Sequence, residues 1–162
     1  MKFLIVVFVI ALAGCHETDD VATLHDQAIA LGTYYRPQLD AFERRVRDLG
    51  ARGPNLGDKN LPGNARAADQ LKLAANQLAD LQSIVMQGAH GKSELENQAD
   101  SLARDRDTTS LTRLVADTRE KLDHDTAVIN SELTAAEMWL LEAEASVKPV
   151  SGLGSGAGSG EP

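Results

Sequence analysis

Apolar residues recur every three or four positions over most of the chain, and this spacing restricts the fold more than any other feature. Between Val21 and Leu49 they form one continuous stripe: Leu24, Ala28, Leu31, Tyr35, Leu39, Phe42, Val46 and Leu49. A period of 3.6 residues places such positions on one face of an α-helix. Pro37 removes a backbone hydrogen bond to Thr33, but the stripe keeps its phase across the proline. We therefore expect one bent helix, with Gly50 in a left-handed cap at its end.

A second helix is predicted from about Ala65 to Gln87. Its apolar residues follow a heptad pattern: Leu71, Leu78 and Val85 are seven apart, with Ala67, Ala74 and Leu81 between them. Heptads of this kind are typical of closely packed helices. A short turn at residues 88–92 then favours an antiparallel neighbour.

The third apolar region, Glu94 to Val147, contains a change of phase. Ser93 and Glu96 fit a capping box at its start. Its first stripe consists of Leu95, Ala99 and Leu102 and is interrupted by the polar run 104–110. A displaced stripe follows: Leu111, Val115, Leu122, Ile129, Leu133, Ala136, Leu140 and Ala143. A helix break near Asp107 and a slip of register within one helix both account for the shift. We prefer the break.

Together these patterns predict an all-α fold, an antiparallel bundle of three or four amphipathic helices over residues 21–148. Cys15 is the chain's single cysteine, so stability must come from a packed core rather than from disulfides. A chain of this length suits one domain. Residues 149–162 are rich in glycine and serine, and we expect a disordered tail there.

The stretch from Ala51 to Asn64 is rich in glycine, proline and asparagine, which predicts a long loop after the first helix. Loops of this length are either functional or mobile. The candidate partner contacts are Asn55, Leu56, Asp58, Lys59, Asn60 and Leu61, together with Trp139. Trp139 belongs to the run Met138–Leu141, which is apolar on more than one face, and a helix between two neighbours is the preferred explanation of that run.

Charged residues near the end of the first helix lie off its apolar stripe: Glu43, Arg44, Arg45, Arg47 and Asp48. We expect them to face water, with a patch that binds anionic envelope groups as the alternative. The chain as a whole has a formal charge of -8, and loss of residues 1–14 removes one lysine, which leaves 15 basic and 24 acidic residues, or -9. This sign argues against nucleic acid as a partner and against electrostatic adhesion to anionic lipid.

The amino terminus reads MKFLIVVFVIALAGC, one lysine followed by an apolar run that closes on Leu12-Ala13-Gly14-Cys15. The run is too short to span a membrane, which takes about 20 apolar residues. It resembles the lipobox of bacterial lipoproteins. The resemblance covers the first 15 of 162 residues. It implies cleavage of the signal peptide 1–14, lipidation of Cys15 with palmitate-type acyl chains, and a spacer at 15–20.

The resemblance also bears on localisation. In the family's enteric sorting rule, aspartate directly after the lipidated cysteine retains a lipoprotein in the inner membrane, and here that position is His16. The resemblance therefore implies an outer-membrane protein that faces the periplasm, if the host has two membranes.

Motifs that carry catalysis are missing from the sequence. It contains no His-Glu-x-x-His, no Glu-x-x-His, no Gly-x-Ser-x-Gly and no Gly-x-x-x-x-Gly-Lys-Ser/Thr phosphate-binding loop. Glu120 and His124 are one helical turn apart, but an ordinary charged face is the preferred interpretation. We predict a non-enzymatic interaction or structural component of the cell envelope. Its partners would be the membrane and an envelope protein or a second copy, and it would need no cofactor and no metal beyond the lipid. The alternative is a periplasmic bundle that binds a metal or small molecule through His25 and His124.

Overall fold

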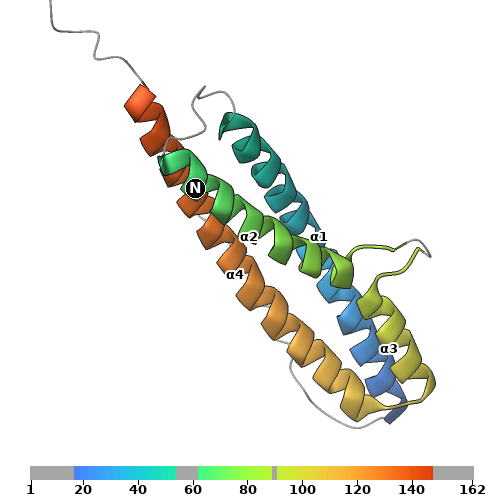
Figure 1. The fold of residues 1–162 in the computed structure, drawn as a ribbon. Helices are drawn as coiled ribbons and strands as arrows, with labels where there is room; N and C mark the ends of the chain where they lie inside the picture. The colour runs from blue at the N-terminus through green and yellow to red at the C-terminus, as the bar shows by residue number, and fades with distance from the viewer. Residues whose placement is uncertain (1–16, 54–61, 89–90, 148–162) are drawn as a thin grey trace, which may run out of the picture.

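The computed structural model describes residues 17–53, 62–88 and 91–147, which form four α-helices: α1 (Glu17–Arg52), α2 (Pro62–Val85), α3 (Glu94–Arg104) and α4 (Thr108–Val147). The predicted all-α bundle is confirmed, as is the connection between the first two helices (Figure 1). The predicted contact residues Asn55 to Leu61, Cys15 with the signal peptide, and the tail 149–162 lie outside the described residues.

The helices form three legs that run up, down and up (Figure 1). Contacts between α1 and α4 keep the same order along both helices: Tyr35 with Asp123, Arg45 with Glu137 and Arg52 with Glu144. These two helices are therefore parallel. α2 and α3 together make the descending leg, α2 beside the upper part of α1 and α3 beside its lower part. At 1.5 Å per residue, α1 is about 54 Å long and α4 about 60 Å.

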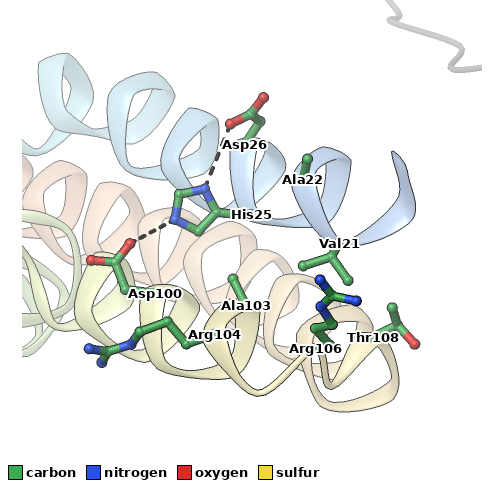
Figure 2. A pocket seen from close by; sticks show the side chains of 9 residues that line it. All are labelled: Val21, Ala22, His25, Asp26, Asp100, Ala103, Arg104, Arg106 and Thr108. Carbon is green, nitrogen blue, oxygen red and sulfur yellow. Dashed lines mark hydrogen bonds and ion pairs between the residues drawn. The ribbon is translucent and has the colours of Figure 1, made fainter. Parts of the chain in front are cut away.

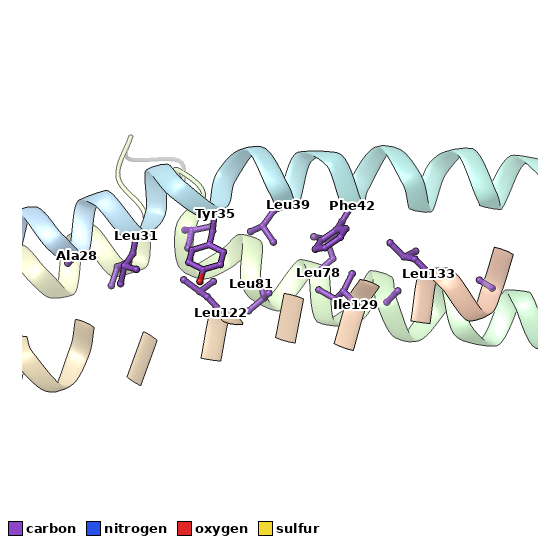
Figure 3. Close-up of a cluster of buried hydrophobic side chains, with 14 of the residues drawn as sticks. Ala28, Leu31, Tyr35, Leu39, Phe42, Leu78, Leu81, Leu122, Ile129 and Leu133 are labelled. Atoms are coloured by element: carbon purple, nitrogen blue, oxygen red, sulfur yellow. The ribbon is translucent and has the colours of Figure 1, made fainter. Parts of the chain in front are cut away.

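The core is a column of apolar side chains enclosed by the three legs (Figure 3). The predicted stripe of α4 is buried throughout, and the stripes of α1, α2 and α3 are buried except for a few partly buried positions: Leu24, Val46, Leu71 and Leu102. Thr118 and Thr126 occupy two further buried positions on α4. The Thr126 hydroxyl donates to the Leu122 carbonyl at 2.6 Å, so this polar group is satisfied within its own helix.

One continuous helix passes through Pro37, as the apolar phase predicts. Pro37 and Thr33 are both exposed, so water can hydrogen-bond the Thr33 carbonyl that the proline leaves free. The predicted cap at Gly50 is wrong. The helix continues to Arg52, and Gly50 does not have a positive φ angle. Glycine is tolerated in this last turn because the end of α1 is held by the Arg52–Glu144 ion pair.

α2 starts three residues earlier than predicted, at Pro62, because Gly63 allows its first turn to pack tightly against α4. A Cβ atom on Gly63 would lie 2.5 Å from the Trp139 carbonyl oxygen and 3.1 Å from the Ala143 Cβ. The Arg66 guanidinium lies 4.6 Å from the Trp139 ring centroid, in cation–π contact. These contacts fix the start of α2 against the end of α4.

The descending leg is interrupted halfway down the bundle. Arg36 Nη2 donates to the carbonyl of Val85, the last residue of α2, at 3.2 Å. A turn with Gly91 at φ 77° follows. The predicted capping box then starts α3: the Glu96 amide donates to Ser93 Oγ and the Ser93 amide to Glu96 Oε2, both at 3.1 Å. Each end of the interruption is thus hydrogen-bonded.

The predicted break near Asp107 is confirmed, and it consists of two consecutive caps. The Arg106 amide donates to the Ala103 carbonyl and the Asp107 amide to the Leu102 carbonyl, which is the Schellman arrangement. Arg106 therefore occupies the left-handed position, at φ 55°, where glycine is preferred. Asp107 in turn accepts hydrogen bonds from the Ser110 hydroxyl at 2.6 Å and from the Ser110 amide at 2.9 Å, which caps α4. The hydroxyl bond first, and then the amide bond, lower the pKa of this carboxyl.

One prediction about side-chain exposure needs correction, and a second holds in part. Arg45 does not simply face water, because its guanidinium donates to Asn130, Thr134 and Glu137 on α4. The run Met138–Leu141 lies where α4 packs between α1 and α2, as predicted, but its apolar side chains are not all covered. Leu140 is buried and Trp139 packs against the core, while Met138 and Leu141 are exposed. With three legs, α4 has no third neighbour to cover its outer face.

Replacing Leu78 by Asp tests whether the predicted stripe is the stabilising core. Leu78 is 3% exposed, so the substitution removes apolar packing and buries an unpaired carboxylate. We expect a loss of at least about 3 kcal/mol in the free energy of unfolding. Leu73→Asp on the same helix is the control, since Leu73 is 49% exposed. Equal thermal unfolding curves for the two variants, measured by circular dichroism, would contradict this assignment of the core.

Arg106→Gly should stabilise the protein, because glycine adopts the left-handed conformation without the steric cost that Arg106 carries. We expect a gain of about 1 kcal/mol in the free energy of unfolding, measured by chemical denaturation. Gly91→Ala is the matched opposite, at φ 77° with no atom within 4 Å of the added Cβ. It should lose a similar amount. A destabilised Arg106→Gly variant would show that the arginine side chain makes contacts that outweigh the backbone cost.

Candidate functional site

An open groove of about 800 Å³ lies where the start of α1 meets α3 and the α3–α4 turn. Figure 2 shows its walls. α1 contributes Val21, Ala22, His25 and Asp26, and the opposite wall and turn contribute Asp100, Ala103, Arg104, Arg106 and Thr108. We call this the α1–α3 groove. It carries side chains of both charges around a small apolar floor, an arrangement suited to binding a polar ligand with separated charges.

A hydrogen-bonded chain of three side chains crosses one end of the groove. His25 Nε2 lies 2.8 Å from Asp100 Oδ1, and Lys92 Nζ donates to the other oxygen of the same carboxylate. These bonds, first that from Lys92 and then that from His25, hold the pKa of the Asp100 carboxyl below its usual value. On the outer side, His25 Nδ1 is 3.7 Å from Asp26 Oδ1. These hydrogen-bonded side chains join α1 to α3.

Two arginines of the groove have no such partners. Arg104 and Arg106 are exposed, and neither forms an ion pair with any residue in the described ranges. In Figure 2 the Arg106 side chain rises toward Val21, across the mouth of the groove, while Arg104 extends along α3. Both guanidinium groups are therefore available to an anionic ligand.

A second groove, of about 790 Å³, runs between α1 and α4. Its polar lining comes from Gln27 and a set of α4 side chains: Thr112, Arg119, Glu120, Asp123 and His124. Asp123 accepts a hydrogen bond from the Tyr35 hydroxyl. Burial first, and then this hydrogen bond, raise the pKa of Tyr35, so the phenol stays protonated. Asp123 is thus engaged in holding α1 to α4.

The structure does not bring the two histidines of the alternative prediction together. His25 lines the α1–α3 groove and His124 the groove between α1 and α4. Within residues 17–53, 62–88 and 91–147, no group of three or more His, Cys, Asp or Glu side chains is arranged to hold a metal ion. Glu120 and His124 line the same groove without a third acidic or histidine ligand in such a group.

Trp139 lies far from both grooves, where α4 passes the start of α2. Its ring is covered by the Arg66 guanidinium, and it packs against the core. Met138 and Leu141 beside it present more apolar surface to solvent, at 65% and 53% exposed. The predicted contact at Trp139 therefore falls at the upper end of the bundle, near the helix ends Arg52 and Pro62 that flank the predicted contact loop.

Sequence reasoning did not identify the α1–α3 groove. His25 and Asp100 are 75 positions apart, and no local pattern indicates that they meet. One signal was available in the polar run 104–110, which contains no glycine or asparagine. A helix that ends there in a left-handed cap must place another residue in that conformation, and this residue is Arg106.

Comparison of the chain with protein-family models, with curated proteins and with solved structures finds no match. Among the helices in the described ranges, none combines the length and the hydropathy that crossing a lipid bilayer requires.

Asp100→Asn should lower the melting temperature at neutral pH, and the difference from the unmodified chain should disappear in acid. Because the folded-state pKa of Asp100 is lowered, its stabilising effect is complete above its ordinary pKa near 4 and is lost as pH falls through the folded value. Asp107, whose pKa is also lowered, is present in both proteins, so its contribution to the pH dependence cancels in the difference. Melting temperatures from pH 2 to 7 measure this.

Asp26→Asn is the control for that measurement, since the Asp26 side chain is 83% exposed and has only the 3.7 Å contact with His25. It should change the pH profile little. A constant difference between Asp100→Asn and the unmodified chain across the whole pH range would show that the Asp100 charge does not stabilise the fold.

Proposed function

We propose that this protein is a membrane-anchored lipoprotein that acts as a non-enzymatic interaction or structural component of the cell envelope. The support comes from the motif Leu12-Ala13-Gly14-Cys15 together with the helical bundle that follows it in the sequence. The acyl chains on Cys15 would hold the mature chain in the outer membrane of a two-membrane host, with the bundle in the periplasm. Burial of several acyl chains gives stable attachment where one chain gives only reversible attachment.

The observation that carries this proposal is that few residues of the sequence separate the lipidation site from the first helix. α1 begins at Glu17, only two residues after Cys15. Two residues of fully extended chain reach about 7 Å. The start of α1, the end of α3 and the start of α4 lie at the same end of the bundle (Figure 1), so this end would rest close to the membrane surface.

The opposite end of the bundle would then be the one presented to a partner. It contains the end of α1, the start of α2 and the end of α4, including Arg52, Pro62 and Trp139. If α1 stands upright, its length carries this end about 54 Å from the membrane. The predicted contact loop joins Arg52 to Pro62 and so starts and finishes there. An anchor at one end and a contact segment at the other describe a spacer or adaptor.

The test combines lipidation and partner capture in the native host. The unmodified chain should have the mass of a mature lipoprotein that begins at acylated Cys15. Cys15→Ser should leave an unprocessed precursor. A photo-crosslinking residue at position 59 of the anchored chain should capture one envelope protein, or a second copy of the chain, at the expected distance from the membrane.

The matched control replaces residues 54–61 by a glycine-serine linker of equal length, with the crosslinker moved to position 73 on the exposed face of α2. Capture should be lost while the helical circular dichroism signal is unchanged. An unprocessed mass in the unmodified chain would refute lipidation. Capture that is unaffected by the linker would refute the contact loop, independently of lipidation.

A further inference from the structure

The α1–α3 groove lies at the end of the bundle that follows Cys15 in the chain. Val21 and Ala22, which line it, are six and seven residues after Cys15 and belong to the first turns of α1. If Cys15 is lipidated, the groove is within reach of the headgroups that surround the acyl anchor. The following inference rests on that part of the proposed function.

The groups available for binding in the groove are two cations and one anion. Asp100 is already engaged by Lys92 and His25. Arg104 and Arg106 form no ion pair among the described residues, and the Asp26 side chain is 83% exposed with a single contact at 3.7 Å. Guanidinium groups bind phosphate through paired N–H donors. A carboxylate binds an ammonium group. The groove therefore matches a ligand that carries a phosphate and an ammonium close together.

The backbone conformation of Arg106 is a second, independent observation that supports a binding role for the groove. The left-handed position of the Schellman cap favours glycine, yet it holds an arginine at φ 55°. This conformation aims the side chain across the mouth of the groove toward Val21 (Figure 2). Strained residues of this kind concentrate at binding sites, where the cost in stability is retained for function.

We propose that the α1–α3 groove binds the zwitterionic headgroup of a membrane phospholipid, with Arg106 on the phosphate and Asp26 on the ammonium. A zwitterionic lipid surface has no net charge, so the chain's overall negative charge does not oppose the approach. The ligand is of the phosphatidylethanolamine type, because a primary ammonium can donate hydrogen bonds to the Asp26 carboxylate and the quaternary ammonium of phosphatidylcholine cannot.

Headgroup binding would give the bundle a second attachment beside the first. A lipid on Cys15 fixes one point of the chain but leaves the angle of the bundle to the membrane free. A headgroup held between α1 and the α3–α4 turn would fix that angle as well. The upper end of the bundle, with Arg52 and Pro62, would then be held away from the membrane instead of lying along it.

The experiment uses the lipidated full chain in phosphatidylcholine vesicles with increasing fractions of a photoreactive phosphatidylethanolamine, whose reactive group is on the acyl chain next to the glycerol. Mass spectrometry maps the crosslinks. We expect saturable crosslinking to peptides that contain residues 20–26 and 100–108. Arg106→Gly should raise the half-saturating lipid fraction about tenfold, the effect of losing one charge-assisted hydrogen bond. Arg106→Lys should restore part of the binding.

Arg106→Gly is informative because it is expected to stabilise the fold, so weaker binding cannot be attributed to unfolding. Arg44→Gly is the matched control, since Arg44 is exposed and lies in the upper part of α1. It should leave the half-saturating fraction unchanged. Asp26→Asn should weaken crosslinking to phosphatidylethanolamine but not to a photoreactive phosphatidylglycerol, which has no ammonium.

Three results would overturn the proposal. The first is crosslinking that Arg106→Gly does not change, and the second is crosslinking that maps to the upper end of the bundle. The third is complete competition by inorganic phosphate, which would identify a site for free phosphate. The mass of the purified chain reports lipidation separately. If the chain is not lipidated, the same lipid titration is made with the chain as purified, and a lack of saturable crosslinking at 20–26 and 100–108 would then overturn the headgroup site as well.

Discussion

The packing of α4 against both other legs holds this fold together. Its buried positions follow a spacing of three and four residues from Leu111 to Ala143, and they run the whole length of the bundle. α1 is its parallel neighbour, and α2 and α3 share its other side. Because neither α2 nor α3 spans the bundle alone, α4 and α1 are the continuous elements on which the two shorter helices are assembled. Burial of a leucine or isoleucine side chain contributes about 1.5–3 kcal/mol, so this column supplies most of the stabilisation.

Polar contacts around the column fix the alignment of the helices. Arg45 and Arg52 of α1 each bind a glutamate on α4, and Tyr35 binds Asp123 further down. An apolar stripe alone permits sliding by one turn, since a leucine one turn away presents a similar surface. A shift of one turn would break all of these cross-helix pairs, so the pairs oppose such sliding. At the upper end, Gly63 adds a steric condition, because only a residue without a side chain fits against the Trp139 carbonyl. These contacts select one alignment among several of similar apolar burial.

The helical fold could be predicted because its signals are local. The stripes identified the buried face of each helix, and Ser93 with Glu96 located the start of α3. The errors arose where distant residues decide the outcome. Glycine is a common cap residue, but α1 continues past Gly50 to Arg52, whose side chain forms an ion pair with Glu144 of α4. Arg45 is off the apolar stripe, and only the position of α4 shows that it has partners there.

The α1–α3 groove could not be predicted for the same reason. It depends on a contact between His25 of α1 and Asp100 of α3, which are 75 positions apart in the sequence. It also depends on an arginine in the left-handed backbone conformation, which the apolar period of a helix does not reveal. Sequence patterns therefore established the helices and the buried faces, while the alignment of the legs and the chemistry of the groove required the structure. The lipobox prediction stands apart from both, since it depends on residues 1–15 alone.

The interruption of the descending leg divides the bundle into two parts of unequal local stability. α3 has 11 residues, fewer than an isolated helix needs to be stable in water, so it depends on its packing through Leu95 and Ala99 and on its caps. α2 is twice as long and contributes more buried positions. Local opening should therefore begin at α3, while α1, α2 and the upper part of α4 remain folded. Amide hydrogens of α3 would exchange with solvent before those of α2, and the shape of the α1–α3 groove would fluctuate on the timescale of that opening.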